Sequence, residues 1–306
     1  MLLAERALQC TSPSSYAFTM PRRMKIVVAI AALFALGAAL VAVDRTFGVA
    51  ARDGSAATRL VLPPARGEIG LPPVLGPPDP GRPLLVIDPG HGGHDPGAGQ
   101  GDTREKDLTL ALGRALRDEL LRQGGVRVAL TRDDDRYLLL PERAGIARRL
   151  GADLFVSIHA DSGGSETASG ATIYTLSEKG SSQIAARMAE RENRADMIDG
   201  VMLADQSDRV SAILVDLSQR ETQARSEQFA GLLRREAQGS IKLRDEPLQS
   251  AAFVVLKSAD IPSVLLEAGY ISNTGDSAWM LSGEGRQTFA AAGAKAVRAY
   301  FARQSR

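Results

Sequence analysis

The chain has 306 residues, of which 44% are hydrophobic and 24% are charged, and its formal net charge is +1. This balance is typical of a globular protein and excludes an intrinsically disordered chain. A net charge so close to zero does not support nucleic-acid binding, which usually shows a basic excess. The single cysteine, Cys10, cannot build a disulfide or a thiolate metal site.

The N-terminal segment, residues 1–43, predicts an export signal or a membrane anchor. Arg22, Arg23 and Lys25 precede an uninterrupted apolar stretch at 26–43, and a basic region followed by an apolar one is the secretory pattern. The stretch is longer than the ~7–15 residues of a signal peptide's apolar core. It just reaches the ~17 residues that a membrane span needs. The alternative is a buried core helix.

Residues 44–82 are rich in proline and glycine and predict a semi-extended linker, because proline fixes φ and removes a hydrogen-bond donor. The remaining residues, 83–304, fit a single domain. Helices are predicted at 105–122, 141–150, 181–195, 210–236 and 284–302, and strands at 84–87, 126–130, 154–158, 170–176, 253–256 and 263–267. Thr103 is expected to cap the first helix and Gly124 to end it. The alternation predicts an α/β fold whose twisted, mostly parallel or mixed sheet has helices on both faces.

Three of the predicted strands end on polar residues. The strand at 84–87 leads into Asp88-Pro89-Gly90-His91, the strand at 154–158 leads into His159, and Val264-Leu265-Leu266 leads into Glu267. Continuous apolar runs are typical of strands buried on both faces. Ligands of open α/β sheets gather beyond the carboxyl ends of the strands. We therefore expect His91, His159 and Glu267 to share one site.

These residue types favour a metal. Catalytic zinc usually takes three ligands from His and Asp or Glu, and it keeps a fourth position open for water. His91 and His159 are two candidates, although a turn histidine and a satisfied core histidine are the alternatives. Glu105 is the third, since a glycine-rich loop can fold it back toward His91; a solvated glutamate in the first turn of the helix is the alternative. His94 fits a loop histidine better than a ligand.

Glu267 is expected to act on protons. A carboxylate that follows three apolar residues is costly to bury unpaired. Beside a zinc-bound water it can take a proton and later pass it to a leaving amine. The alternative is a salt-bridged glutamate at a strand end.

Five motifs in this chain are similar to those of the zinc-dependent N-acetylmuramoyl-L-alanine amidases of bacterial cell division, and they occur in the family's order. They are Val86-Ile87-Asp88-Pro89-Gly90-His91-Gly92-Gly93, Thr103-Arg104-Glu105-Lys106-Asp107, Leu130-Thr131-Arg132, Ser157-Ile158-His159-Ala160-Asp161, and the run from Ile261 to Asn273. The resemblance implies one zinc ion on His91, Glu105 and His159, with Glu267 as the catalytic carboxylate. It also implies a periplasmic enzyme that cleaves the amide between N-acetylmuramic acid and L-alanine in peptidoglycan, for wall remodelling and daughter-cell separation.

Two features depart from or extend this resemblance. The linker leaves no room for the wall-targeting domain of larger periplasmic members. Residues 177–225 resemble an inserted regulatory segment whose helices cover the zinc until a LytM-type activator binds, although ordinary surface packing is the alternative. Glu178, which opens this segment, is the predicted plug for the open zinc position, and an exposed turn residue is the alternative. Glu190 or Glu192 is the reserve candidate.

Two other functions stay open at this level. A zinc peptidase that cleaves a bond within the stem peptide could use the same metal site. A wall-binding module without catalysis could keep the fold, although it would be free to lose Glu267 or a ligand.

Overall fold

The computed structural model describes residues 70–160, 162, 168–198, 201–202, 212–257 and 260–304. Gly70–Arg306 forms one compact unit. The predicted signal or anchor at 26–43 lies outside the described residues. In the described part of the chain, no helix is long and apolar enough to cross a membrane.

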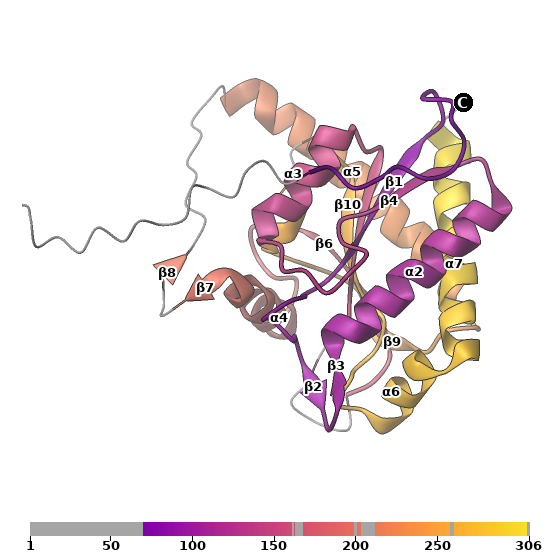
Figure 1. Cartoon of the computed structure of the whole chain (residues 1–306). Helices are drawn as coiled ribbons and strands as arrows, with labels where there is room; N and C mark the ends of the chain where they lie inside the picture. The colour runs from indigo at the N-terminus through magenta and orange to yellow at the C-terminus, as the bar shows by residue number, and fades with distance from the viewer. Residues whose placement is uncertain are drawn as a thin grey trace, which may run out of the picture. The chain divides into compact units, whose positions relative to one another are not determined.

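A six-stranded sheet runs through the unit in the order β4-β1-β5-β10-β6-β9, and Figure 1 shows it between two layers of helices. Its strands are β1 (Leu84–Pro89), β4 (Arg127–Leu130), β5 (Leu154–His159), β6 (Ala171–Leu176), β9 (Leu243–Ala251) and β10 (Ser263–Glu267). β4, β1, β5 and β10 are parallel to one another, and β6 is antiparallel to β10. The predicted mixed sheet is confirmed.

The helices are α2 (Glu105–Gln123), α3 (Leu140–Leu150), α4 (Gln183–Asn193), α5 (Ala212–Ala237), α6 (Thr274–Leu281) and α7 (Gly283–Gln304). Two short hairpins, β2 (Gly99–Gln100) with β3 (Thr103–Arg104) and β7 (Met197–Ile198) with β8 (Val201–Met202), lie outside the main sheet. Gly124 ends α2 at a positive φ of 71°, as predicted, but Thr103 does not cap it. Arg104 is the N-cap, and its side chain makes no capping hydrogen bond.

Two apolar cores hold the helices on opposite faces of the sheet. Leu85 and Ile87 of β1 pack with the apolar faces of α2, α5 and α7, and Figure 1 shows α2 and α7 side by side on that layer. Leu84 and Val86 point the other way and pack with residues of α3 and α4. Side chains alternate along a strand, so a strand buried on both faces needs the continuous apolar sequence that β1 has.

Two boundaries differ from the prediction. The compact unit begins at Gly70 rather than at 83, because the backbone of Leu75 pairs with Val128 of β4 through hydrogen bonds of 2.8 and 2.9 Å. The expected strand at 253–256 is a 3-10 helix, Val254–Leu256, and the strand beside β6 is β9. β9 has a polar, half-exposed sequence with Pro247 inside it, which an edge strand tolerates because one of its sides is unpaired.

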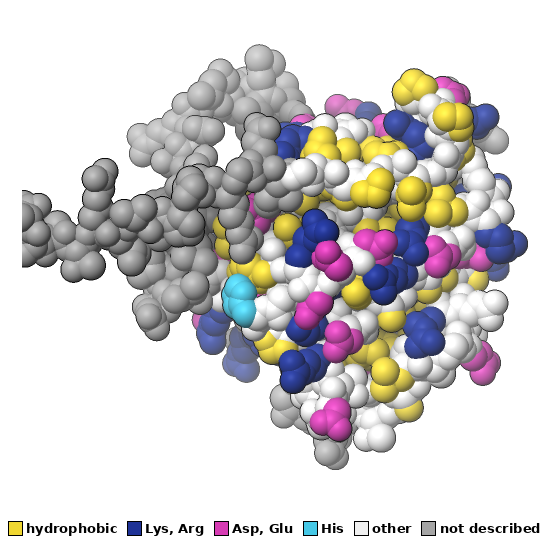
Figure 2. Space-filling view, in the orientation of Figure 1, with side chains coloured by type: hydrophobic (Ala, Val, Ile, Leu, Met, Phe, Trp, Pro, Cys, Tyr) yellow, Lys and Arg dark blue, Asp and Glu magenta, His cyan; other side chains and the backbone are white. Residues whose placement is uncertain are grey.

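Basic and acidic side chains are interspersed over the face of the molecule that carries α2 (Figure 2). The described residues on this face form no continuous basic band of the kind that nucleic-acid-binding domains present.

Candidate metal centre

Neighbouring parallel strands bring the candidate residues to one edge of the sheet. His159 is the last residue of β5, and it pairs in register with Glu267, the last residue of β10. β1 lies on the other side of β5 and ends at Pro89, two residues before His91. The sheet topology therefore brings together the strand ends that carry His91, His159 and Glu267, as predicted.

The loop after β1 is held in an unusual conformation by buried arginines. His91 has a positive φ of 58°, which costs a non-glycine residue roughly 1–2 kcal/mol. Arg143 of α3 donates to the carbonyl oxygen of His91 at 2.8 Å, and Arg132 donates to those of Pro89 and Gly90 at 2.9 and 2.7 Å. Both guanidinium groups are buried. Their hydrogen bonds offset the strain and fix the direction of the His91 side chain.

Asp88 balances one of these charges. Its Oδ1 accepts from Arg143 at 3.0 Å and from the Thr131 hydroxyl at 2.6 Å, and its Oδ2 accepts from the Ser157 hydroxyl at 2.8 Å. Burial alone would raise the pKa of Asp88, but Arg143 and the two hydroxyls outweigh burial and lower it. The carboxylate therefore stays charged and joins three strands to α3.

Two glycines leave room for the ligands. A Cβ atom on Gly90 would lie 2.5 Å from the ring of His159, and a Cβ on Gly97 would lie 2.6 Å from the His91 ring and 2.7 Å from Glu105 Oε2. Gly97 also has a positive φ of 66°. Both positions therefore require glycine, one directly before His91 and one in the loop between His91 and Glu105.

Glu105 is not a solvated residue of the first helical turn. It is 1% exposed, and its carboxylate accepts from the backbone N–H groups of Ala98 and Ala160, both at 2.8 Å. Its two oxygens lie 3.1 Å from His91 Nε2 and 3.2 Å from His159 Nδ1. The glycine-rich loop folds back as predicted and brings Glu105 between the two histidines.

A fourth residue completes the cluster. Glu192, near the end of α4, places Oε2 3.3 Å from His91 Nε2 and 3.1 Å from His159 Nδ1. One nitrogen or oxygen atom from each of His91, Glu105, His159 and Glu192 lies within 4.8 Å of the other three, and all four residues are buried. Two imidazoles and two carboxylates are a donor set that suits zinc.

Two observations favour a cation at the centre of this cluster. His91 Nε2 and Glu192 Oε2 are buried and lie 3.1–3.3 Å from other atoms of the cluster, yet within the described residues neither has a partner in hydrogen-bond geometry. His91 Nδ1 is 2.7 Å from Asp95 Oδ2, and a histidine that donates from one ring nitrogen to a carboxylate turns the other toward a metal. The residues therefore fit a bound metal ion.

The charges of the cluster agree with this fit. Burial alone would lower the pKa of His159, but Glu192 and Glu105 outweigh burial and raise it to about 10. Burial alone would raise the pKa of Glu105, but His91 and His159 lower it to about 2. Two buried carboxylates thus keep protons on two histidines, and a divalent cation could take the place of these protons.

Glu267 lies beside the cluster and is 1% exposed. Burial raises its pKa to about 8; the nearby carboxylates of Glu192 and Glu105 add to the rise, and His159 opposes it. A pKa near neutrality suits a residue that takes a proton and gives it back.

The predicted plug, Glu178, does not join the cluster. It is exposed in the turn after β6. It was predicted because it opens the segment that resembles a regulatory insert, after a strand that was expected to return close to the site. That strand, β6, runs antiparallel to β10, so its end points away from the metal edge. Glu192, a reserve candidate, lies in the cluster, whereas Glu190 is exposed and pairs with Arg194. His94 is an exposed loop residue, as predicted.

Asp95 and Arg143, which support the site, were not predicted from the sequence. Asp95 lies four residues after His91, and a carboxylate at that spacing in a glycine-rich loop is a weak signal. Arg143 lies on a helical face that is otherwise apolar, and a charged residue there could have been read as a partner for a buried acid.

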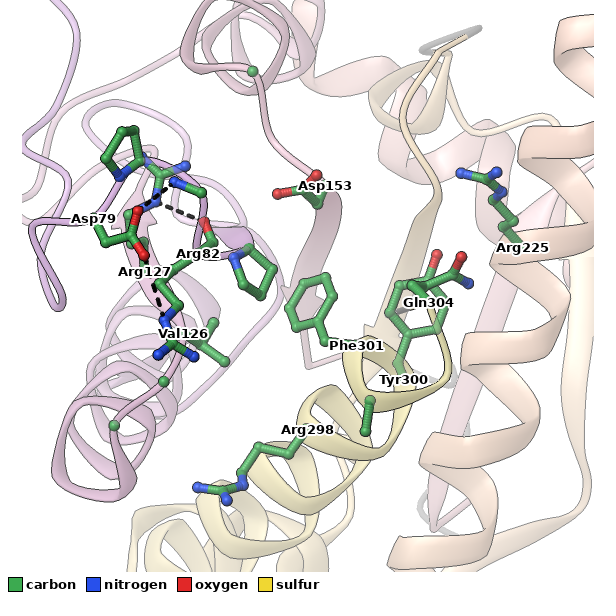
Figure 3. Close-up of a pocket in the computed structure, with 17 residues that line it drawn as sticks. Asp79, Arg82, Val126, Arg127, Asp153, Arg225, Arg298, Tyr300, Phe301 and Gln304 are labelled. Carbon is green, nitrogen blue, oxygen red and sulfur yellow. Dashed lines mark hydrogen bonds and ion pairs between the residues drawn. The ribbon is translucent and has the colours of Figure 1, made fainter. Parts of the chain in front are cut away.

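A larger hollow lies at the opposite end of the sheet, with a volume of about 800 Å³. Figure 3 shows Arg82 and Arg127 together on one wall, Tyr300 and Phe301 of α7 in the middle, and Arg225 on the far wall. It contains no histidine and no group of acids and bases comparable to the cluster. The residue types therefore favour the buried cluster, and not this hollow, as the functional site.

Comparisons with known proteins agree with this placement. The model of the N-acetylmuramoyl-L-alanine amidase family matches residues 85–299, a range that contains all four cluster residues and Glu267. The chain belongs to the N-acetylmuramoyl-L-alanine amidase family. The amidase AmiA of Escherichia coli (strain K12) is 39% identical to this amidase over 223 residues, which are 72% of this chain and 77% of AmiA.

Two other relatives extend the comparison. AmiC of Escherichia coli O6:H1 is 37% identical, and the match covers 76% of this chain and 57% of AmiC. Among solved structures, the amidase AmiC2 of Nostoc punctiforme superimposes with a TM-score of 0.51 at 29% identity, covering 72% of this chain and 98% of AmiC2. This likeness supports the α/β fold as well as the family.

Proposed function

We propose that this amidase hydrolyses the bond between N-acetylmuramic acid and L-alanine of peptidoglycan, with one zinc ion held by His91, Glu105 and His159. The observation that carries this proposal is the buried cluster at the carboxyl edge of the sheet, in a chain of this family. When bound, zinc would polarise the amide carbonyl and lower the pKa of a water molecule.

Glu267 would handle the protons of this reaction. Hydrolysis adds one water across the amide, so a proton has to leave the water and another has to reach the L-alanine nitrogen. The Glu267 carboxylate lies beside His159 and can accept the first proton on an oxygen and then deliver it to the leaving amine. Burial and the neighbouring carboxylates raise its pKa, which makes both transfers accessible near neutral pH.

Glu192 would keep the resting enzyme inactive. Its carboxylate occupies the side of the cluster that faces α4, where a fourth ligand would take the place of the water. For the substrate to enter, Glu192 and the end of α4 have to move. A partner that binds the open state better than the closed state would shift the equilibrium toward activity, and the resemblance to the division amidases suggests a LytM-type protein for this role.

The cellular setting follows from the same proposal. Residues 1–43 would direct export, with 26–43 either removed or kept as an inner-membrane anchor, and residues 44–69 would span the distance to the folded unit. The enzyme would then act on the wall in the periplasm during remodelling and daughter-cell separation.

Mass spectrometry of a defined muropeptide tests the chemistry. The substrate carries N-acetylmuramic acid on a tetrapeptide, and the full chain with Glu192→Ala, which lacks the proposed block, is used with bound zinc and after chelation. We expect cleavage to release an intact peptide with a free L-alanine amine, and we expect this product only when zinc is bound. A cut inside the peptide would show a zinc peptidase instead. No product from the Glu192→Ala enzyme with zinc would favour a binding module.

A further inference from the structure

A row of polar side chains continues from Glu267 beneath α4. In the antiparallel pairing of β10 with β6, Glu267 lies opposite Thr172 and Leu265 lies opposite Tyr174. Residues two apart on a strand share a face, so Glu267, Thr172 and Tyr174 point to the same side. Leu265 and Tyr174 pack in the core that includes Ala185 of α4, which identifies this side as the one that α4 covers.

Two hydroxyl groups in this row are buried without a hydrogen bond. Thr172 Oγ1 and Tyr174 Oη have no hydrogen-bond partner within the described residues, and both side chains are 0% exposed. Buried polar groups are nearly always paired, so each exception calls for an explanation. Burial raises the pKa of Tyr174, and the nearby Glu267 raises it further. The phenol therefore stays protonated and can donate a hydrogen bond.

Arg244 of β9 ends the row with a positive charge. Its Nη1 donates to the Tyr270 hydroxyl at 2.9 Å, and its guanidinium carbon lies 5.8 Å from the centre of the Tyr270 ring. Tyr270 follows Glu267 by three residues. In the described part of the chain no carboxylate lies within ion-pair distance of Arg244, so its charge is held in place but not neutralised. Asp245 and Glu246 beside it are exposed.

Arg244 and Tyr174 line one hollow. It has a volume of about 300 Å³. The start of α4 at Ser182, Ile184 and Ala185 forms its other wall, and Asp245, Glu246 and Gln249 of β9 also line it. The metal cluster lies on the β5 side of Glu267, and this hollow lies on the β6 and β9 side. A substrate whose scissile amide lies at Glu267 would therefore extend one of its two halves along the row.

We propose that this row is the stem-peptide site, in which Arg244 binds a carboxylate of the peptide and Tyr174 donates a hydrogen bond to a peptide carbonyl. Charge decides which half of the substrate lies there, because stem peptides carry carboxylates and an uncharged sugar does not need a guanidinium. The planar fork of arginine also matches a carboxylate with two hydrogen bonds. The inference rests on the proposed function and on the movement of α4, which would widen the hollow.

Paired substrates test this assignment. Two soluble muropeptides are identical except that the stem carboxylates are free in one and converted to primary amides in the other. The parent in this test is the full chain with Glu192→Ala, which avoids the block at the cluster. It is compared with the same chain carrying one further substitution: Arg244→Gln, Arg244→Lys, Tyr174→Phe or Lys242→Gln. Lys242 is an exposed cation just before β9, so Lys242→Gln controls for the loss of one positive charge.

The parent should prefer the free-carboxylate substrate in kcat/KM by about 10- to 100-fold, the usual effect of a hydrogen bond to a charged group. Arg244→Gln should abolish this preference through a higher KM, while the rate on the amide substrate stays within threefold. Arg244→Lys should recover part of the preference. Tyr174→Phe should lower kcat/KM about tenfold on both substrates, and Lys242→Gln should match the parent.

Three results would overturn the assignment: a parent without preference, a preference that survives Arg244→Gln, or an equal loss on both substrates in Arg244→Gln, which would indicate a structural role. Each of these still requires cleavage at the L-alanine amide. If the parent itself, with zinc, does not cleave that amide, it is the proposed function that fails.

Discussion

The Glu192 carboxylate lies 3.1 Å from His159 Nδ1, and the two residues come from elements with different tasks. His159 ends a central strand of the sheet, where its position is fixed by backbone pairing on both sides. Glu192 is near the end of α4, a helix on the surface of the sheet. A residue on such a helix can leave without disturbing the sheet, which is what a removable block requires.

Removal of a ligand should remove the metal. His91→Ala and His159→Ala are each expected to lose bound zinc and most activity, because two imidazole nitrogens point into the cluster. His94→Ala is the matched control, since His94 is exposed and rests against Tyr137. Zinc content by atomic emission decides the outcome. A stoichiometric zinc content in His159→Ala would show that the ligand set is wrong.

Asp95 should support the metal through His91. Its Oδ2 is 2.7 Å from His91 Nδ1, and such partners of metal ligands typically contribute about 10- to 100-fold in metal affinity. Asp95→Asn is therefore expected to weaken zinc binding by that factor in competition with a chelator. Asp102→Asn, in the exposed turn between β2 and β3, serves as the control. Equal affinities in the two variants would mean that Asp95 does not orient His91.

Glu267→Gln should separate metal binding from turnover. The amide is nearly isosteric, but it cannot take a proton, and general acid–base catalysis typically contributes ~10²–10⁴-fold. We expect full zinc content and a loss of kcat within that range. A variant that keeps a third of the parent rate would assign Glu267 a structural role.

Asp88 should link stability to pH. Its folded pKa lies below the ordinary value of 3.8, so its contribution is present above that value and is lost as pH falls through the folded pKa. Asp88→Asn leaves the Arg143 charge buried and uncompensated, which should cost about 3–5 kcal/mol at pH 7. The difference from the parent should shrink at pH 3, because the Asp88 carboxyl of the unfolded parent chain then takes up a proton and favours unfolding.

Urea unfolding of the metal-free protein at both pH values measures this effect. Asp134→Asn is the control, because Asp134 is exposed and pairs with Arg136; its effect should stay within about 1 kcal/mol. A pH-independent difference for Asp88→Asn would contradict the charged state that we assign to Asp88.

Much of the fold and most of the site could be predicted because they depend on strongly patterned residues. The apolar runs of β1, β5 and β10 lead into His91, His159 and Glu267, and parallel pairing then brings the ends of these strands together. β9 was missed because an edge strand is half exposed and its sequence shows no alternation. Glu192 was only a reserve candidate because the sequence does not indicate the direction of β6 or which turn of the following helix faces the cluster.

The rate of amide cleavage in Glu192→Ala tests the central claim most directly. Dye-labelled peptidoglycan is digested without any partner protein by the parent, Glu192→Ala, Glu190→Ala and Glu178→Ala, all loaded with zinc. Glu190 lies on the same helix as Glu192 but is exposed, so it is a matched control. We predict that Glu192→Ala releases dye at least tenfold faster than the parent while the other two variants match it. Equal rates for Glu192→Ala and the parent would contradict the account of a self-blocked metal site.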